Sequence, residues 1–97
     1  MPKFETKDKD LYIDNQKVIK GWESFTGWFW FATEEAYKQD SILSNGKEIP
    51  NDTIYYGLVQ CQEQEWGYFS KGELESLKPK IWEIKEIDLP YSGRRRL

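Results

Sequence analysis

Residues 28–33 read Trp-Phe-Trp-Phe-Ala-Thr, and this stretch decides how the rest of the chain is interpreted. Aromatic residues favour strands, and here they fill both the odd and the even positions. A strand with two apolar faces is typical of the middle of a sheet, or of a sheet covered on both sides. The remaining sequence therefore has to supply neighbours for both faces.

Two further strands are predicted downstream. Residues 53–59 (Thr-Ile-Tyr-Tyr-Gly-Leu-Val) and 65–69 (Glu-Trp-Gly-Tyr-Phe) are rich in β-branched and aromatic residues. Residues 60–64 between them have the length of a hairpin loop. With 28–33, these segments predict an antiparallel meander.

A short helix is predicted to follow the third strand. Ser70 and Glu73 have the spacing of a capping box, in which a serine caps the helix and a glutamate follows three positions later. We expect a helix over about 71–78, ended by Pro79. Residues 81–89 then predict a final strand, with a bulge at 85–86 to restore its alternation.

The upstream region is less regular. Residues 11–13 and 18–19 flank 14–17, where Asp14-Asn15 favours a turn, so they predict a short hairpin or one irregular segment. Residues 21–27 predict a loop. Thr33 is expected to cap a helical turn.

The segment 39–52 also predicts a loop, because it contains Asn45-Gly46 and Pro50. The fold class is therefore α+β and mostly β: an antiparallel sheet of four to five strands with one short helix before the last strand. The expected organisation is a flexible arm over 1–9, one globular domain over 10–91 and a basic tail over 92–97.

Charge is unevenly distributed along the chain. The 97 residues carry a formal net charge of −3. Residues 21–77 hold ten acids and three lysines, whereas residues 94–96 are three arginines. An acidic body argues against a general nucleic-acid-coating protein, whose affinity comes mostly from Lys and Arg on phosphates.

Cellular location is predicted from two features. Cys61 is the single cysteine, so an internal disulfide is not possible. The N-terminus lacks the apolar region of a signal peptide, and the longest apolar run, 28–32, is far too short to span a bilayer. We expect a soluble cytoplasmic protein with no membrane partner.

The sequence offers little catalytic chemistry. It contains no histidine, the commonest general base. Glu63 and Glu65 follow Cys61 closely in the sequence, and nearby carboxylates disfavour the thiolate form of a cysteine. As an alternative, the two glutamates could act as an acid/base pair or bind a divalent ion. We predict a non-enzymatic protein with no catalytic residue, cofactor or metal site.

Three motifs resemble a known family. They are Trp28-Phe29-Trp30-Phe31-Ala32-Thr33-Glu34, then Tyr56-Gly57-Leu58-Val59, then Glu63-Gln64-Glu65-Trp66-Gly67-Tyr68-Phe69-Ser70 followed by Glu73-Leu74-Glu75. This order resembles a family of small proteins encoded on plasmids, integrative elements and phages, catalogued as a domain of unknown function. Residues 60–62 depart from the glycine-containing turn common there. The resemblance implies a shared fold and a mobile-element setting, and no activity.

A binding surface is the remaining functional prediction. The candidate residues combine sheet aromatics, a rim of acids and the arginine tail: Trp28, Trp30, Glu34, Glu35, Tyr55, Glu63, Glu65, Trp66, Arg94, Arg95 and Arg96. Exposed sheet aromatics suit either a protein interface or stacking on single-stranded nucleic acid; alternatively, they are all core. Because the rim is acidic, we favour a protein partner, such as a nucleic-acid-processing or host-defence protein, over nucleic acid.

Overall fold

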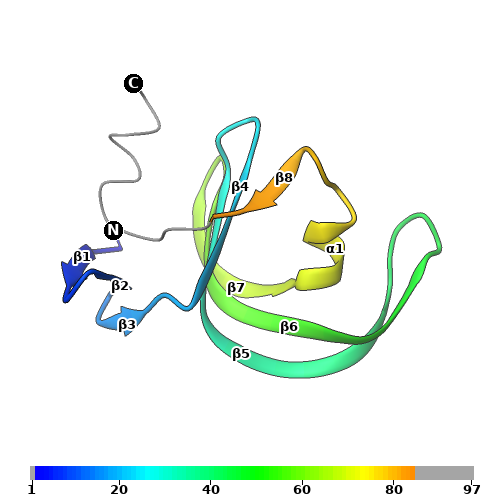
Figure 1. Ribbon diagram of the computed structural model, residues 1–97, viewed down its shortest axis with the longest axis horizontal. Helices are drawn as coiled ribbons and strands as arrows, with labels where there is room; N and C mark the ends of the chain where they lie inside the picture. Colours follow the sequence, from blue (N-terminus) through cyan, green and yellow to red (C-terminus); the bar gives the residue numbers. More distant parts are fainter. Residues whose placement is uncertain (1, 85–97) are drawn as a thin grey trace.

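The computed structural model describes residues 2–84 and contains two antiparallel sheets (Figure 1). The elements are β1 (Phe4–Lys7), β2 (Asp10–Ile13), β3 (Gln16–Lys17), β4 (Lys20–Ser24), β5 (Phe29–Ile42), β6 (Glu48–Gln60), β7 (Gln64–Ser70), α1 (Lys71–Glu75) and β8 (Ile81–Glu83). The smaller sheet has the order β1-β2-β3, and the larger has β7-β6-β5-β4-β8. The long strands β5 and β6 curve strongly, and α1 and β8 lie on the concave side (Figure 1).

The predicted meander and the position of the helix are confirmed. The strands β5, β6 and β7 pair in sequence order, and α1 precedes the last described strand. The Ser70 hydroxyl accepts the Glu73 N–H at 3.0 Å, as expected of a cap. The helix ends at Glu75, sooner than the predicted 71–78, so the protein is mostly β. Residues 85–89 of the predicted final strand lie outside the described residues.

The prediction of a loop over 21–27 is wrong for its first half, which forms β4. Trp22 pairs with Trp30 across β4 and β5, and its side chain is 1% exposed. Burial of this one large ring, worth a few kcal/mol, outweighs the turn-forming tendency of its neighbours Gly21 and Ser24.

The predictions of a helical turn at Thr33 and a loop over 39–52 are also wrong. Both segments belong to the hairpin of β5 and β6, and only 43–47 connects the strands. Three register shifts in β5 break the period-two pattern that reveals a strand. Gly46 supplies the left-handed residue of the turn, with φ of +87°.

The N-terminal region forms a small sheet rather than the expected flexible arm. Residues 4–7 pair with β2, and the Phe4 ring packs edge-on against Phe31 at 6.0 Å. The predicted hairpin is confirmed, but its turn is shorter than the expected 14–17: only Asp14 and Asn15 form it, and the second strand is Gln16–Lys17 rather than 18–19. Both turn residues have positive φ, as a two-residue type I′ turn requires.

The large sheet is covered on both faces, as the 28–33 pattern predicts. We call the face toward α1 the inner face and the face toward the small sheet the outer face. The inner cluster comprises Trp22, Ala32, Tyr55, Leu74 and Ile81. The outer cluster comprises Leu11, Ile13, Val18, Phe29, Phe31, Leu58 and Ile84. Successive residues at the start of β5 therefore pack alternately into two separate hydrophobic cores.

Candidate functional site

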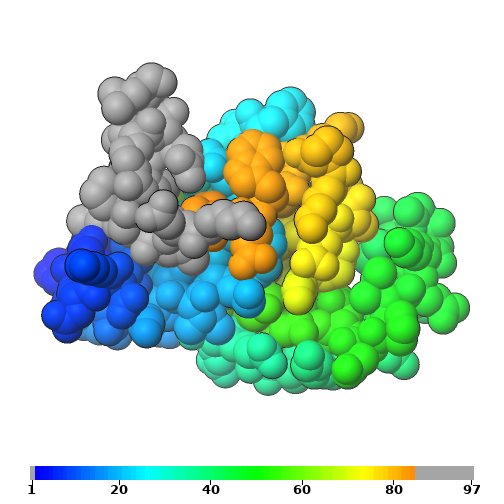
Figure 2. All heavy atoms as spheres, viewed as in Figure 1, coloured from blue at the N-terminus to red at the C-terminus, as the bar shows by residue number. Residues whose placement is uncertain are grey.

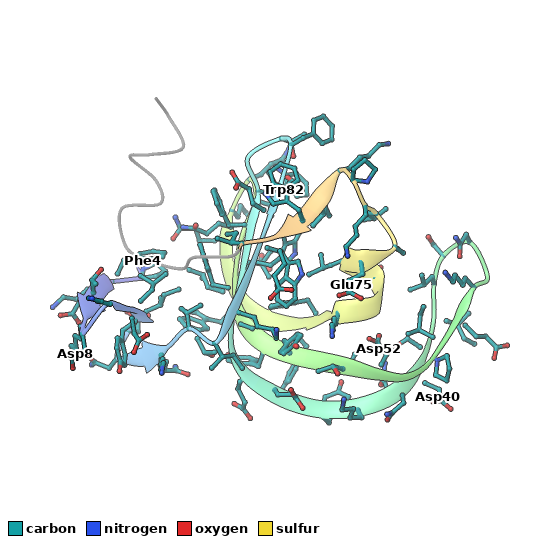
Figure 3. All side chains as sticks on the ribbon, viewed as in Figure 1. Phe4, Asp8, Asp40, Asp52, Glu75 and Trp82 are labelled. Carbon is teal, nitrogen blue, oxygen red and sulfur yellow. The ribbon has the colours of Figure 1, made fainter. Side chains whose placement is uncertain are left out.

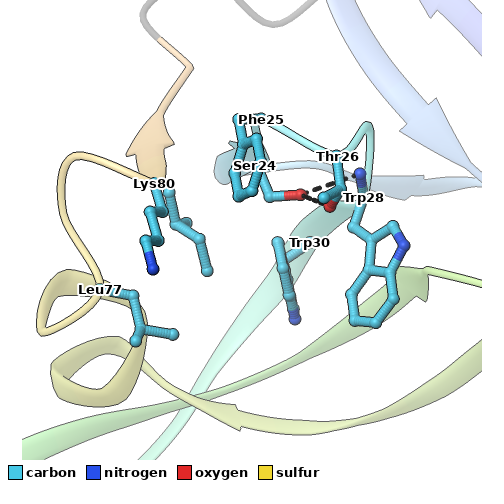
Figure 4. A pocket seen from close by; sticks show the side chains of 8 residues that line it. Ser24, Phe25, Thr26, Trp28, Trp30, Leu77 and Lys80 are labelled. Atoms are coloured by element: carbon cyan, nitrogen blue, oxygen red, sulfur yellow. Dashed lines mark hydrogen bonds between the residues drawn. The ribbon is translucent and has the colours of Figure 1, made fainter.

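An apolar cleft lies between the β4–β5 turn and the connection from α1 to β8 (Figure 4). Its volume is about 240 Å³. The lining residues are Ser24, Phe25, Thr26, Trp28, Trp30, Leu77, Lys80 and Ile81. In the space-filling view, the turn and the α1–β8 connection lie along the same end of the molecule (Figure 2).

Hydrogen bonds within the β4–β5 turn hold its aromatic side chains outward. The Ser24 hydroxyl accepts the Trp28 N–H at 3.1 Å and is hydrogen-bonded to the Thr26 hydroxyl at 2.7 Å. Gly27 adopts φ of +90°, which closes the turn. Phe25 is left 69% exposed and Trp28 40% exposed.

The two walls of the cleft are joined to each other. The Phe25 N–H donates to the carbonyl of Lys80 at 2.9 Å. In addition, β8 pairs with β4 from Ser24 opposite Ile81 onward. The cleft is therefore largely preformed, which lowers the entropic cost of binding.

An aromatic cluster beneath Trp30, which we call the floor, supports the cleft from below without lining it. The rings of Trp22, Tyr55 and Phe69 contact one another, with centroids 5.3 to 5.9 Å apart. Burial raises the pKa of Tyr55, and the nearby carboxylates of Glu35, Glu83, Glu75 and Asp52 raise it further. The tyrosine hydroxyl therefore stays neutral, and its ring acts as core.

Asp52 fixes α1, and hence one wall of the cleft, to the sheet. Its side chain is on the part of β6 that faces α1 (Figure 3). The carboxylate accepts the Gly72 N–H at 2.8 Å and the Ser41 hydroxyl at 2.7 Å, and it also accepts the Ser70 hydroxyl. Burial opposes ionisation, but these hydrogen bonds together lower the pKa of Asp52. Asp52 is thus a buried carboxylate that anchors α1 to the sheet.

The structure brings only part of the predicted site together. Trp28 and Trp30 contact each other in the cleft, with ring centroids 6.3 Å apart. Glu65 shares a cross-strand row with Trp30 through Val59, so it lies on the same face at the sheet edge. Glu63 is exposed in the turn before β7.

The other predicted residues lie elsewhere. Tyr55 is 2% exposed, so its assignment to an interface is wrong. Glu34 and Glu35 lie within β5, opposite Tyr56 and Tyr55 of β6, and neither of them lines the cleft.

Trp66 packs on the outer face, away from the cleft, where its ring stacks on Tyr56. Arg94, Arg95 and Arg96 lie outside the described residues.

Sequence reasoning missed six of the eight residues that line the cleft, and Phe25, Leu77 and Lys80 are the most informative of them. Phe25 falls in the segment interpreted as a loop, although an isolated aromatic residue in a polar turn was a usable signal. Leu77 falls within the predicted helix over 71–78, but it follows α1 and remains half-exposed. Lys80 is the single charged residue in the lining of the cleft, and only tertiary contacts bring it there.

No protein-family model, curated protein or solved structure matches this chain. The family resemblance of the three motifs therefore stays a prediction. Over residues 2–84, no helix has the length and apolar character needed to cross a bilayer. The same residues contain no group of three or more Cys, Asp or Glu placed to hold a metal ion.

Proposed function

We propose that this protein is a non-catalytic binding module that accepts an extended segment of a partner protein in the apolar cleft. The observation that carries the proposal is the pair of outward aromatic side chains, Phe25 and Trp28, held above a preformed apolar floor. Small domains gain stability by burying such rings, so a turn that holds them in solvent favours a recognition role.

The size of the cleft defines the ligand. Sites for drug-sized molecules and cofactors have volumes of about 300–1,000 Å³, and this cleft has about 240 Å³. It suits one or two apolar side chains. The Ser24 and Thr26 hydroxyls are hydrogen-bonded to each other, so neither hydroxyl needs a polar group of the ligand. Apolar anchors are thus favoured over polar ones.

The net charge of the protein indicates which residues should flank the apolar anchor in the partner segment. Residues 2–84 contain fifteen acids and ten lysines. A basic partner segment would associate faster with such a surface. We therefore favour an apolar anchor flanked by Lys or Arg. The resemblance to mobile-element proteins adds the expectation that the partner is a cytoplasmic nucleic-acid-processing or host-defence protein.

Selection from a library of random peptides tests the proposal. Enriched peptides should share an apolar anchor and change the intrinsic tryptophan fluorescence on titration. Trp28→Ala should weaken their binding by about 30-fold, the equivalent of about 2 kcal/mol. Tyr37→Ala on the outer face is the matched control and should leave binding unchanged. Absence of enriched peptides, or binding that survives both Phe25→Ala and Trp28→Ala, would contradict the proposal.

A second candidate function is single-stranded nucleic-acid binding on the outer face. The observation that favours it is a row of contacting rings formed by Trp66, Tyr56, Tyr68 and Tyr37. Bases stack on such platforms. The acidic body opposes it. Binding of an oligonucleotide that falls steeply with salt, and that weakens when the chain is truncated after Gly93, would favour this candidate.

A further inference from the structure

Strand β7 is an open edge of the large sheet. Within residues 2–84, its backbone pairs only with β6, in continuous register from Ile54 opposite Ser70 to Gln60 opposite Gln64. Its seven residues contain no proline or lysine. Proteins usually protect an exposed edge with such residues or with a bulge. β7 has no bulge in its pairing with β6, and its one charged residue is Glu65, near the start of the strand.

The centre of β7 is Gly67, where packing within the monomer does not require a glycine. A Cβ built at Gly67 would meet no atom within 4 Å. At the cross-strand neighbour Gly57, in contrast, a Cβ would lie 1.8 Å from the carbonyl oxygen of Phe31. Glycine within a strand often marks a place where another backbone approaches closely. Next to Gly67, Tyr68 is 64% exposed.

We propose that β7 pairs with β7 of a second copy, antiparallel and about a two-fold axis at Gly67. A two-fold interface places the same surface on both sides, so the strand must complement itself. Gly67 is the midpoint of Gln64–Ser70, and this register therefore pairs all seven residues. Residues that share a face then oppose each other, and the outer faces of the two sheets become continuous.

Side-chain chemistry supports this register. Trp66 comes to lie opposite Tyr68 of the second copy, twice by symmetry, which extends the existing ring row across the interface. Beyond the strand ends, this register brings the turn that holds Glu63 close to the start of α1 of the second copy, which holds Lys71. A shift of the axis to Trp66 or to Tyr68 leaves only five paired residues.

The interface leaves the cleft free. The cleft is formed by β5, the β4–β5 turn and the α1–β8 connection, whereas β7 is the opposite edge from β8 in the strand order. A dimer therefore presents two clefts, and its existence does not depend on what the clefts bind. Two linked clefts would raise the affinity for a partner with repeated segments.

The molar mass of the full chain, measured by sedimentation equilibrium over a range of concentrations, tests the proposal. The wild type should be a dimer. Gly67→Lys should weaken dimerisation by about 30-fold or more, since it places two like charges opposite each other across the axis. The open space at Gly67 lets the monomer stay folded, which circular dichroism verifies. Ile42→Lys, at the exposed tip of β5, is the matched control and should remain dimeric.

A disulfide test checks the register. In a Cys61→Ser background, Gly67→Cys should form a covalent dimer, because residues facing each other across an antiparallel pair have Cα atoms about 4.5–5.5 Å apart. Glu63→Lys should weaken the dimer, and Lys71→Glu added to it should restore it. A monomeric wild type, or a dimer indifferent to Gly67→Lys, overturns the proposal. The wild type could instead be a monomer whose β7 amides are protected from hydrogen exchange only when a different protein binds. That result would mean that the edge pairs with that protein and not with a second copy.

Discussion

The floor and the rim of the cleft use the same kinds of side chain in opposite ways. On the floor, Trp22, Tyr55 and Phe69 contact one another beneath the surface. At the rim, Phe25 and Trp28 project into solvent from a hydrogen-bonded turn. The floor is required for folding, and the rim is available for recognition. Whether an aromatic residue of this protein stabilises the fold or is available to a partner therefore depends on where the backbone places it, in a covered strand or in an exposed turn.

Among the variants that test this division between floor and rim, Trp22→Ala should cause the largest loss of stability. Removal of a fully buried tryptophan leaves a cavity and costs about 3–5 kcal/mol, a large part of the free energy of unfolding of a small domain, about 5–15 kcal/mol. We expect most of the chain to lose its cooperative thermal transition. A melting temperature close to that of the wild type would show that Trp22 is not the centre of the inner core.

Gly57→Ala tests the backbone packing next to the floor. Its new methyl group would clash with the carbonyl oxygen of Phe31 and the Cα of Ala32, both backbone atoms that cannot rotate away. We expect a loss of about 3 kcal/mol in a urea titration. Gly67→Ala is the matched control, and it should change the unfolding free energy of the monomer by less than about 0.5 kcal/mol. Equal effects at the two glycines would contradict the structure.

Asp52→Asn tests the anchor that holds α1 above the floor. Loss of the charge weakens three hydrogen bonds and should cost about 2 kcal/mol at neutral pH. The pKa of Asp52 is lowered by folding, so its contribution is complete above the ordinary aspartate pKa of about 4 and is lost as the pH falls through the lower value. The stability difference between wild type and variant should therefore shrink in acid. A difference that is constant from pH 7 to pH 2 would mean that the charge contributes nothing.

The smallest expected effect on stability is at the rim. Phe25→Ala removes a side chain that is mostly in solvent, so the unfolding free energy should change by less than about 0.5 kcal/mol. The same variant should lose most of its affinity for peptides selected on the wild type. Thermal melting and fluorescence titration on one sample measure both. A large drop in melting temperature would move Phe25 from the rim to the core.

The sequence by itself determined the central strand, the meander that follows it and the serine cap of α1. Each of these is encoded locally: alternating or two-faced apolar runs for strands, and a Ser-to-Glu spacing for the cap. The turn at Asp14-Asn15 was predicted for the same reason, because left-handed residues are a local requirement.

Tertiary structure alone decided β4, the long hairpin and the cleft. Trp22 becomes a strand residue because Trp30 lies opposite it, and the bulges in β5 are stable because β6 continues to pair beyond them. Asp52 is buried because Ser41, Ser70 and Gly72 converge on it from distant positions. Which aromatic side chain is floor and which is rim depends on such long-range contacts, and local patterns do not record them.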